Sequence, residues 1–168
     1  MNNEFSQEKV RERYTKLTRA LIEKSITVST MESITSGQIA SLITDTEGSS
    51  AVFKGGFVTY CNEAKVQNGV KKEIIEKYGV YSHETAKAMA NACSDKFGTD
   101  LGIGITGSAG NVDPNNGDSI PGNCFFAISY KGKTESFNIS IPNFETRLQY
   151  KLYVADSIAE EIFKIIDK

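Results

Sequence analysis

Ile26-Thr-Val-Ser-Thr-Met31 is a short apolar run that breaks at Glu32-Ser33-Ile34-Thr35-Ser36-Gly37, before the pattern Gln38-Ile-Ala-Ser-Leu-Ile-Thr-Asp45 begins. This order predicts a strand over 26–31 that feeds a helix over 36–45 through a tight polar turn. Such a turn exposes the residues on it, here Ser33. Because the first turn of a helix has unpaired backbone N–H groups, we predict that Thr35, Ser36 and Gly37 favour an anion or an oxyanion.

About thirty residues further on, a second strand is predicted over Phe57–Tyr60, and it runs into Cys61-Asn-Glu-Ala-Lys65. Asn62 can cap a short helix that carries Lys65 on its first turn. A serine, an oxyanion pocket and a lysine are the parts of a serine–lysine hydrolase. The residue types alone leave another interpretation open. Serines at strand–helix turns are commonly N-caps, lysines after strands are commonly solvated, and Tyr60 can simply pack on the core.

Three blocks of the sequence carry a resemblance to a known family. They are Glu32-Ser33-Ile34-Thr35-Ser36-Gly37, Gly56-Phe57-Val58-Thr59-Tyr60-Cys61-Asn62-Glu63-Ala64-Lys65 and Thr106-Gly107-Ser108-Ala109-Gly110. In this order they resemble the signature blocks of the CinA C-terminal domain family, the nicotinamide-nucleotide amidohydrolases or NMN deamidases. The resemblance extends from about Leu17 to the C-terminus, and the Tyr-x-Asn-Glu-Ala-Lys block is its most specific part.

The resemblance implies a reaction and the residues for it. The family hydrolyses the carboxamide of nicotinamide mononucleotide (NMN) to nicotinate mononucleotide and ammonia, and needs no cofactor. Its serine nucleophile corresponds to Ser33, its lysine base to Lys65 and its assisting tyrosine to Tyr60, which could relay a proton or orient the lysine amine. Asn62 would be a helix cap first and a substrate contact second. A small-residue loop would admit the ribose or the pyridine: Thr106, Gly107, Ser108, Ala109 and Gly110.

The sequence also departs from the family pattern. Ser36 stands where the first block usually has a glycine, and Asn111 stands where the third block usually has a proline. Two arginines four residues apart, plausible phosphate ligands, usually begin the last helix. Aligned without a gap on Pro142, those positions read Glu145 and Gln149, whereas a two-residue insertion turns them into Arg147 and Lys151. The latter pair lies on one helix face and is our predicted phosphate site.

The rest of the chain predicts a fold class. Helices are expected over 7–24, 71–78, 82–97 and 143–167, and strands over 101–105, 123–130 and 133–141. The βαβ units give parallel strand pairs and the hairpin at Lys131-Gly132 gives an antiparallel one, so the expected fold is a three-layer α/β/α sandwich with a mixed, mostly parallel central sheet. Open sheets of this kind bind ligands at the carboxyl ends of strands, where all three blocks lie.

Length and composition set further limits. A length of 168 residues fits one domain over 1–168, and a net charge of −2 gives no electrostatic footprint for nucleic acid. Three widely spaced cysteines and the absence of a signal-peptide pattern favour the cytoplasm. No run is long enough for a membrane span. Small cytosolic enzymes of this kind are commonly symmetric homodimers or higher homo-oligomers, which is our expectation here.

Two other functions remain open at this stage. The chain could be a catalytically silent binding module associated with competence or DNA damage, or a Ser/Lys amidase for another small amide. Other chemistries find less support. No motif ties the sole histidine, His83, to Cys61, which disfavours a Cys/His hydrolase, and scattered carboxylates give no metal-ligand cluster.

Overall fold

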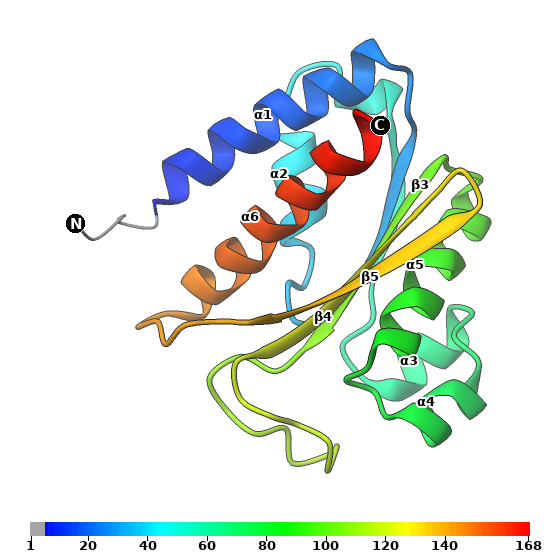
Figure 1. The fold of residues 1–168 in the computed structure, drawn as a ribbon, viewed down its shortest axis with the longest axis vertical. Coiled ribbons are helices and arrows are strands. Elements are labelled where there is room, and N and C mark those ends of the chain that lie inside the picture. Colours follow the sequence, from blue (N-terminus) through cyan, green and yellow to red (C-terminus); the bar gives the residue numbers. More distant parts are fainter. Residues whose placement is uncertain (1–5) are drawn as a thin grey trace.

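A five-stranded sheet runs through the middle of the fold in the order β2-β1-β3-β4-β5 (Figure 1). The computed structural model describes residues 6–168; the first five residues, which belong to the predicted domain and to its charged N-terminus, lie outside the described residues. The strands are β1 (Val28–Glu32), β2 (Phe53–Val58), β3 (Leu101–Gly107), β4 (Asn123–Tyr130) and β5 (Lys133–Ser140).

The sheet is mixed, as the sequence predicts. β1 pairs in parallel with both β2 and β3, and β3-β4 and β4-β5 pair antiparallel, so one end of the sheet is parallel and the other is an antiparallel hairpin. In register, Glu32 at the end of β1 lies between Val58 of β2 and Ile105 of β3. The three chain segments that follow these strands therefore begin close together, at the carboxyl ends of the strands.

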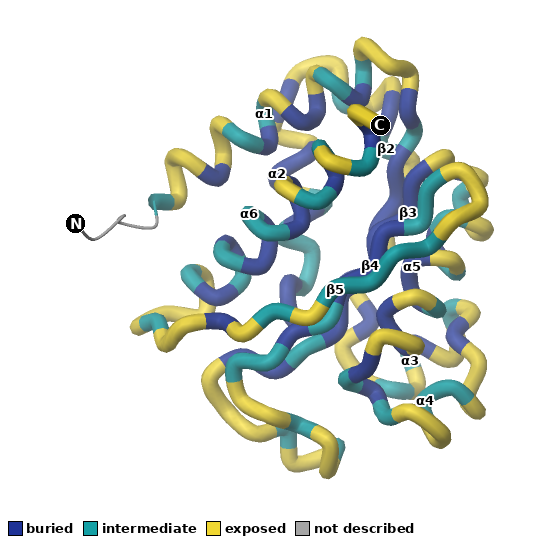
Figure 2. Tube along the Cα trace, viewed as in Figure 1, coloured by how far each residue is buried: buried dark blue, intermediate teal, exposed yellow. Residues whose placement is uncertain are grey.

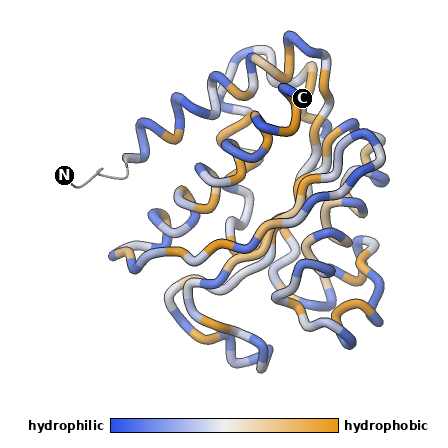
Figure 3. Tube along the Cα trace, viewed as in Figure 1, coloured by the Kyte–Doolittle hydropathy of each residue, from blue (hydrophilic) through white to orange (hydrophobic). Residues whose placement is uncertain are grey.

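Helices cover both faces of the sheet, which confirms the predicted three-layer α/β/α class. On one face lie α1 (Gln7–Glu23), α2 (Gln38–Thr44) and α6 (Arg147–Ile166); on the other lie α3 (Asn62–Gln67), α4 (Lys72–Tyr78) and α5 (His83–Phe97) (Figure 1). A short 3-10 turn, Ser49–Ala51, precedes β2. The central strands β1 and β3 are buried along nearly their whole length, whereas β2 and β5 at the two edges of the sheet are partly exposed (Figure 2). The helices are hydrophobic on the sides that face the sheet (Figure 3). Within residues 6–168, no helix is long and apolar enough to cross a membrane.

Caps fix where several helices begin and end. Ser82 caps α5 by accepting the N–H of Thr85, and Gly98 ends it in the left-handed region at φ 62°. The last helix starts later than predicted, at Arg147, because Thr146 and Gln149 form a capping box there. Phe144, expected inside this helix, lies before it.

Three other expectations about local structure were wrong. β2 covers Phe53–Val58 and ends two residues before Tyr60, so Tyr60 lies in the connection to α3. The cap position of α3 is Cys61, and Asn62 is the first helical residue. Lys65 lies in the last turn of this six-residue helix rather than in its first, which removes the helix N-terminus as a cause of any perturbation of its amine.

Two glycines in β3 let α5 lie directly on the sheet. A Cβ atom at Gly102 would lie 2.2 Å from the Ala90 carbonyl oxygen, and one at Gly104 would lie 2.3 Å from that of Ala86. The obstructing atoms are helix backbone, which cannot move aside as a flexible side chain can. The absence of side chains at Gly102 and Gly104 therefore allows α5 to approach β3 closely.

Gly104→Ala should therefore destabilise the protein by about 3 kcal/mol or more, because α5 must move away from β3. Gly117→Ala is the matched control: a Cβ atom there meets nothing within 4 Å. Urea unfolding of both variants measures the difference. Equal midpoints would show that α5 can adjust without cost and that the glycines are not packing requirements.

Candidate active site

Ser33 is the first residue after β1 and lies on a tight turn. Its N–H donates to the Ile105 carbonyl at 3.1 Å, and its carbonyl accepts the N–H of Ser36 at 3.0 Å. Ser36 and Gly37 then adopt left-handed backbone angles, with φ 45° and 94°, which turn the chain into α2. The Ser33 side chain is 7% exposed and lines a cleft of about 930 Å³, within the range of small-molecule sites.

Glu32, directly before Ser33, holds the start of α2. Its fully buried carboxylate accepts three backbone N–H groups, those of Gly37 at 3.0 Å, Ile39 at 3.1 Å and Ala40 at 2.9 Å. Glu32 therefore has a structural role at the start of α2. This arrangement corrects the oxyanion prediction, because the N–H groups of Gly37 and Ser36 are already occupied.

Two backbone donors remain beside the serine. Among the described residues, the N–H groups of Ile34 and Thr35 have no hydrogen-bond partner within the chain. Ile34 lines the cleft together with Ser33, whereas Thr35, Ser36 and Gly37 do not. The Ile34 N–H is therefore the candidate donor for an oxyanion on a substrate bound at Ser33. The Thr35 hydroxyl is buried and has no hydrogen-bond partner in the part of the chain that the structure describes.

Lys65 reaches Ser33 from α3 on the opposite face of the sheet. Its side chain is 2% exposed, and its Nζ donates to the Ser33 hydroxyl oxygen at 3.3 Å and to the Thr59 carbonyl at 2.9 Å. Burial lowers the pKa of Lys65 from 10.5 to about 8, and nearby Cys61 and Asp113 oppose part of that shift. About one molecule in ten then has a neutral amine at pH 7, enough for a general base.

Tyr60 lines the cleft, but its hydroxyl contacts Arg147 and not Lys65, the partner that the sequence predicts. The residue is 63% exposed, and its hydroxyl accepts a hydrogen bond from Nη2 of Arg147 at 3.3 Å. The Thr59 carbonyl, not Tyr60, holds the lysine amine. Tyr60 thus joins Arg147 on the cleft wall, and a part for it in proton transfer stays a prediction.

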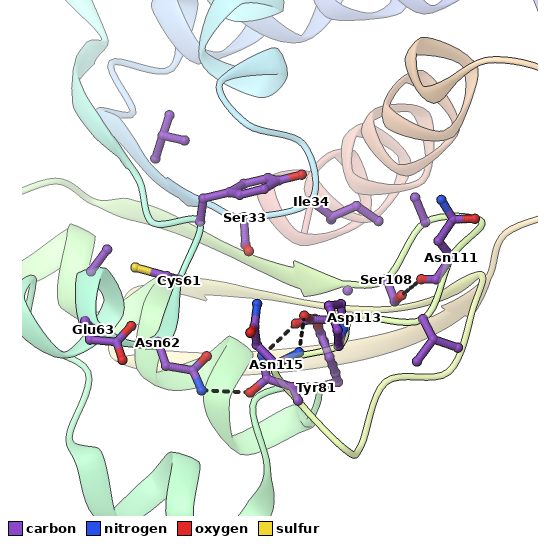
Figure 4. A pocket seen from close by; sticks show the side chains of 18 of the residues that line it. Ser33, Ile34, Cys61, Asn62, Glu63, Tyr81, Ser108, Asn111, Asp113 and Asn115 are labelled. Atoms are coloured by element: carbon purple, nitrogen blue, oxygen red, sulfur yellow. Dashed lines mark hydrogen bonds between the residues drawn. The ribbon is translucent and has the colours of Figure 1, made fainter.

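The loop after β3 forms the facing wall of the cleft. Gly107, Ser108 and Ala109 line it, whereas Thr106 is buried and donates to the Val80 carbonyl, and Gly110 packs near the Tyr150 hydroxyl. Further along, the loop adds residues that the sequence did not indicate, among them Asn111, Val112, Asp113 and Asn116, and Tyr81 joins them from before α5 (Figure 4). Their only sequence signal was a polar loop over 111–122.

A hydrogen-bond chain attaches this loop to the lysine helix. Asn62 donates to the Asn116 side chain at 2.7 Å, and Asn116 donates to Asp113 at 2.6 Å (Figure 4). Asp113 also accepts the Tyr81 hydroxyl at 2.6 Å. Asn62 therefore contacts the loop rather than capping its helix, and its buried side-chain oxygen has no hydrogen-bond partner among residues 6–168.

Sequence comparison places the chain in a family. The sequence model of the CinA C-terminal domain matches residues 10–160. The chain belongs to this family. A CinA-like protein of Flavobacterium psychrophilum is 41% identical over 157 residues, 90% of this chain but only 37% of that relative. The chain thus spans little more than a third of the relative's length.

Solved CinA superfamily structures share the fold. The protein from Escherichia coli aligns with a TM-score of 0.84 at 22% identity, over 98% of this chain and 93% of that one. The competence/damage inducible protein CihA from Agrobacterium tumefaciens aligns with a TM-score of 0.82 at 26% identity, over 92% and 94% of the two chains. Both likenesses agree with the three-layer architecture described above.

Within this CinA domain, the two cations predicted for a phosphate separate. Arg147 lines the cleft, but Lys151, one turn further along α6, donates to the Ser36 hydroxyl and lies outside the cleft lining. Gln149 is occupied in the capping box of α6. Lys151 therefore supports the left-handed turn at Ser36, the residue that replaces the usual glycine, and it is not placed as a cleft ligand.

The buried lysine makes stability depend on pH. The folded state holds a proton on Lys65 less tightly than the unfolded state, so stability should rise between pH 8 and 10.5 as that proton is lost. Lys65→Met should therefore be more stable than the native protein near pH 7, by up to about 3 kcal/mol, and the gain should vanish near pH 10.5.

Urea unfolding across this pH range measures the effect. Lys87→Met is the control, because Lys87 lies exposed on α5. A gain from Lys65→Met that does not change with pH would contradict a charged, buried Lys65 in the native protein.

Proposed function

We propose that this CinA-family chain is an amidohydrolase that converts NMN to nicotinate mononucleotide and ammonia. One observation carries the proposal: a buried amine of lowered pKa lies 3.3 Å from a serine hydroxyl at the base of a cleft. A serine close to a group that can take its proton is the arrangement of an activated nucleophile. The family resemblance supplies the substrate.

The first half of the reaction forms an acyl-enzyme. Ser33 Oγ attacks the carboxamide carbon while its proton passes to the neutral Lys65 amine. The carbonyl oxygen gains negative charge, which the Ile34 N–H can stabilise. Lys65 then returns the proton to the amide nitrogen, the C–N bond breaks, and ammonia leaves a nicotinoyl ester on Ser33.

The second half restores the enzyme. Water attacks the ester carbon and gives its proton to Lys65. The C–O bond to Ser33 then breaks, the proton returns to the Ser33 oxygen, and the carboxylic acid product ionises. Because Lys65 acts first as base and then as acid in each half, a pKa near the working pH suits both steps.

A silent binding module fits the site less well. Burying a lysine disfavours its charged form and so lowers the stability of the folded protein. A protein that does not use a neutral amine would gain nothing in return for this loss. An amidase for another small amide shares the same machinery and differs only in the cleft contacts. Ammonia release from NMN, measured beside nicotinamide and glutamine, separates these functions.

Ser33→Ala should lower kcat for NMN by at least about 10³-fold, because only binding and oxyanion effects remain. Lys65→Arg should be as inactive as Lys65→Met, since a guanidinium keeps its proton at any usable pH. In the native enzyme, kcat/KM should rise with pH through about 8, where Lys65 loses its proton. Substantial activity in Lys65→Arg would show that Lys65 supplies only a positive charge.

Arg147→Ala should raise KM for NMN about 10- to 100-fold and change KM for nicotinamide riboside, which lacks the phosphate, far less. Lys151→Ala is the matched control on the same helix, because Lys151 is outside the cleft lining. It should affect both substrates alike, through the turn at Ser36. Equal effects of Arg147→Ala on the two substrates would remove Arg147 from the phosphate site.

A further inference from the structure

The cleft holds a carboxylate that the proposed hydrolytic steps do not use. Asp113 accepts the Tyr81 hydroxyl and the Asn116 side chain, each at 2.6 Å, and the Asn115 N–H at 2.9 Å. These bonds, the one from Tyr81 foremost, hold the pKa of Asp113 below its usual range. Asp113 is therefore a fixed negative charge at every pH at which Lys65 can act as a base.

The Asp113 carboxylate lies in the same cleft as the nucleophile. Asp113 and Ser33 both line the cleft, Asp113 from the loop after β3 and Ser33 from the turn after β1 (Figure 4). Asp113 and Lys65 are close enough to shift each other's pKa, which brings the carboxylate within electrostatic range of the reacting end of the cleft.

The remaining lining also suits a cation. Tyr60 and Tyr81 both border the cleft, and aromatic faces attract positive charge. Burial and Asp113 raise the pKa of Tyr81, so its hydroxyl keeps the proton that it donates to the carboxylate. Arg147 provides the opposite charge elsewhere on the lining. A ligand with a cationic ring and an anionic tail would match this distribution.

We propose that Asp113 is a specificity-determining residue, which selects amides carried on an N-alkylated pyridinium ring over amides carried on a neutral aromatic ring. Alkylation of the ring nitrogen gives the ring a permanent positive charge, whereas unmodified nicotinamide and benzamides have none. A fixed carboxylate discriminates between two rings of the same shape by this charge alone. The inference rests on the proposed function for its reaction, but the recognition can be measured without turnover.

Glu63 provides an internal control for the effect of charge. It is a second carboxylate of the cleft lining, but it is exposed in the first turn of α3 and has no hydrogen-bond partner among residues 6–168. Water and salt screen such a charge, so it should contribute little to the choice of ring.

The test compares nicotinamide riboside with benzamide riboside, in which carbon replaces the charged ring nitrogen. The native enzyme should prefer the cationic riboside in kcat/KM, and Asp113→Asn should reduce this preference at least about tenfold. Glu63→Gln should leave it within about twofold. Any effect on folding acts on both ribosides and cancels in the ratio. A native enzyme with no preference, or a preference unchanged in Asp113→Asn, would overturn the proposal.

A binding measurement separates this inference from the proposed reaction. In the Ser33→Ala background, calorimetry should show tighter binding of nicotinamide riboside than of benzamide riboside, and adding Asp113→Asn should abolish most of the difference. If the native enzyme releases no ammonia from NMN but this pattern holds, the proposed function fails and the recognition by Asp113 stands. Failure of the cationic riboside to bind, or equal binding of the two, overturns the recognition whatever the native enzyme hydrolyses.

Discussion

The Glu32 carboxylate is the interaction on which the rest of the site depends. A carboxylate buried without partners would be strongly unfavourable, and here three backbone N–H groups at the start of α2, including that of its cap residue Gly37, compensate it. These bonds tie the end of β1 to the start of α2, so the intervening residues must form a compact turn. Ser33 occupies that turn, and its position is therefore set by a side chain that never enters the cleft.

The parallel register brings the base to the same place. The N–H of Thr59 donates to the Glu32 carbonyl at 2.8 Å, which continues the β1-β2 pairing one step past the end of β2. The Thr59 carbonyl then accepts the Lys65 amine. The turn after β1 and the connection after β2 are thus joined by backbone bonds, and the distance between Ser33 and Lys65 follows from sheet geometry rather than from flexible side chains.

The sequence predicted what local patterns and the family blocks encode. The spacing of apolar residues and the turn residues between them predicted the order of the helices and strands. The family blocks predicted Ser33 and Lys65, and the fold brings these two side chains into contact. Tertiary contacts decided the rest. The N–H of Gly37 is taken by Glu32 through a contact that periodicity cannot show, and Tyr81 meets Asp113 across 32 residues. The helix expected over 143–167 begins at Arg147 instead, because the capping box at Thr146, a local Thr-x-x-Gln signal, fixes its start.

Asp113 links the recognition proposed for the cleft to its proposed chemistry. Its negative charge favours the charged form of Lys65 and so opposes the lowering of the lysine pKa by burial. A pyridinium held beside Asp113 would offset that negative charge. The amine would then lose its proton more readily in the substrate complex than in the free protein. A neutral ring would leave the carboxylate uncompensated and the lysine more fully protonated. The same charge would thus both select the substrate and increase the fraction of neutral lysine when that substrate is bound.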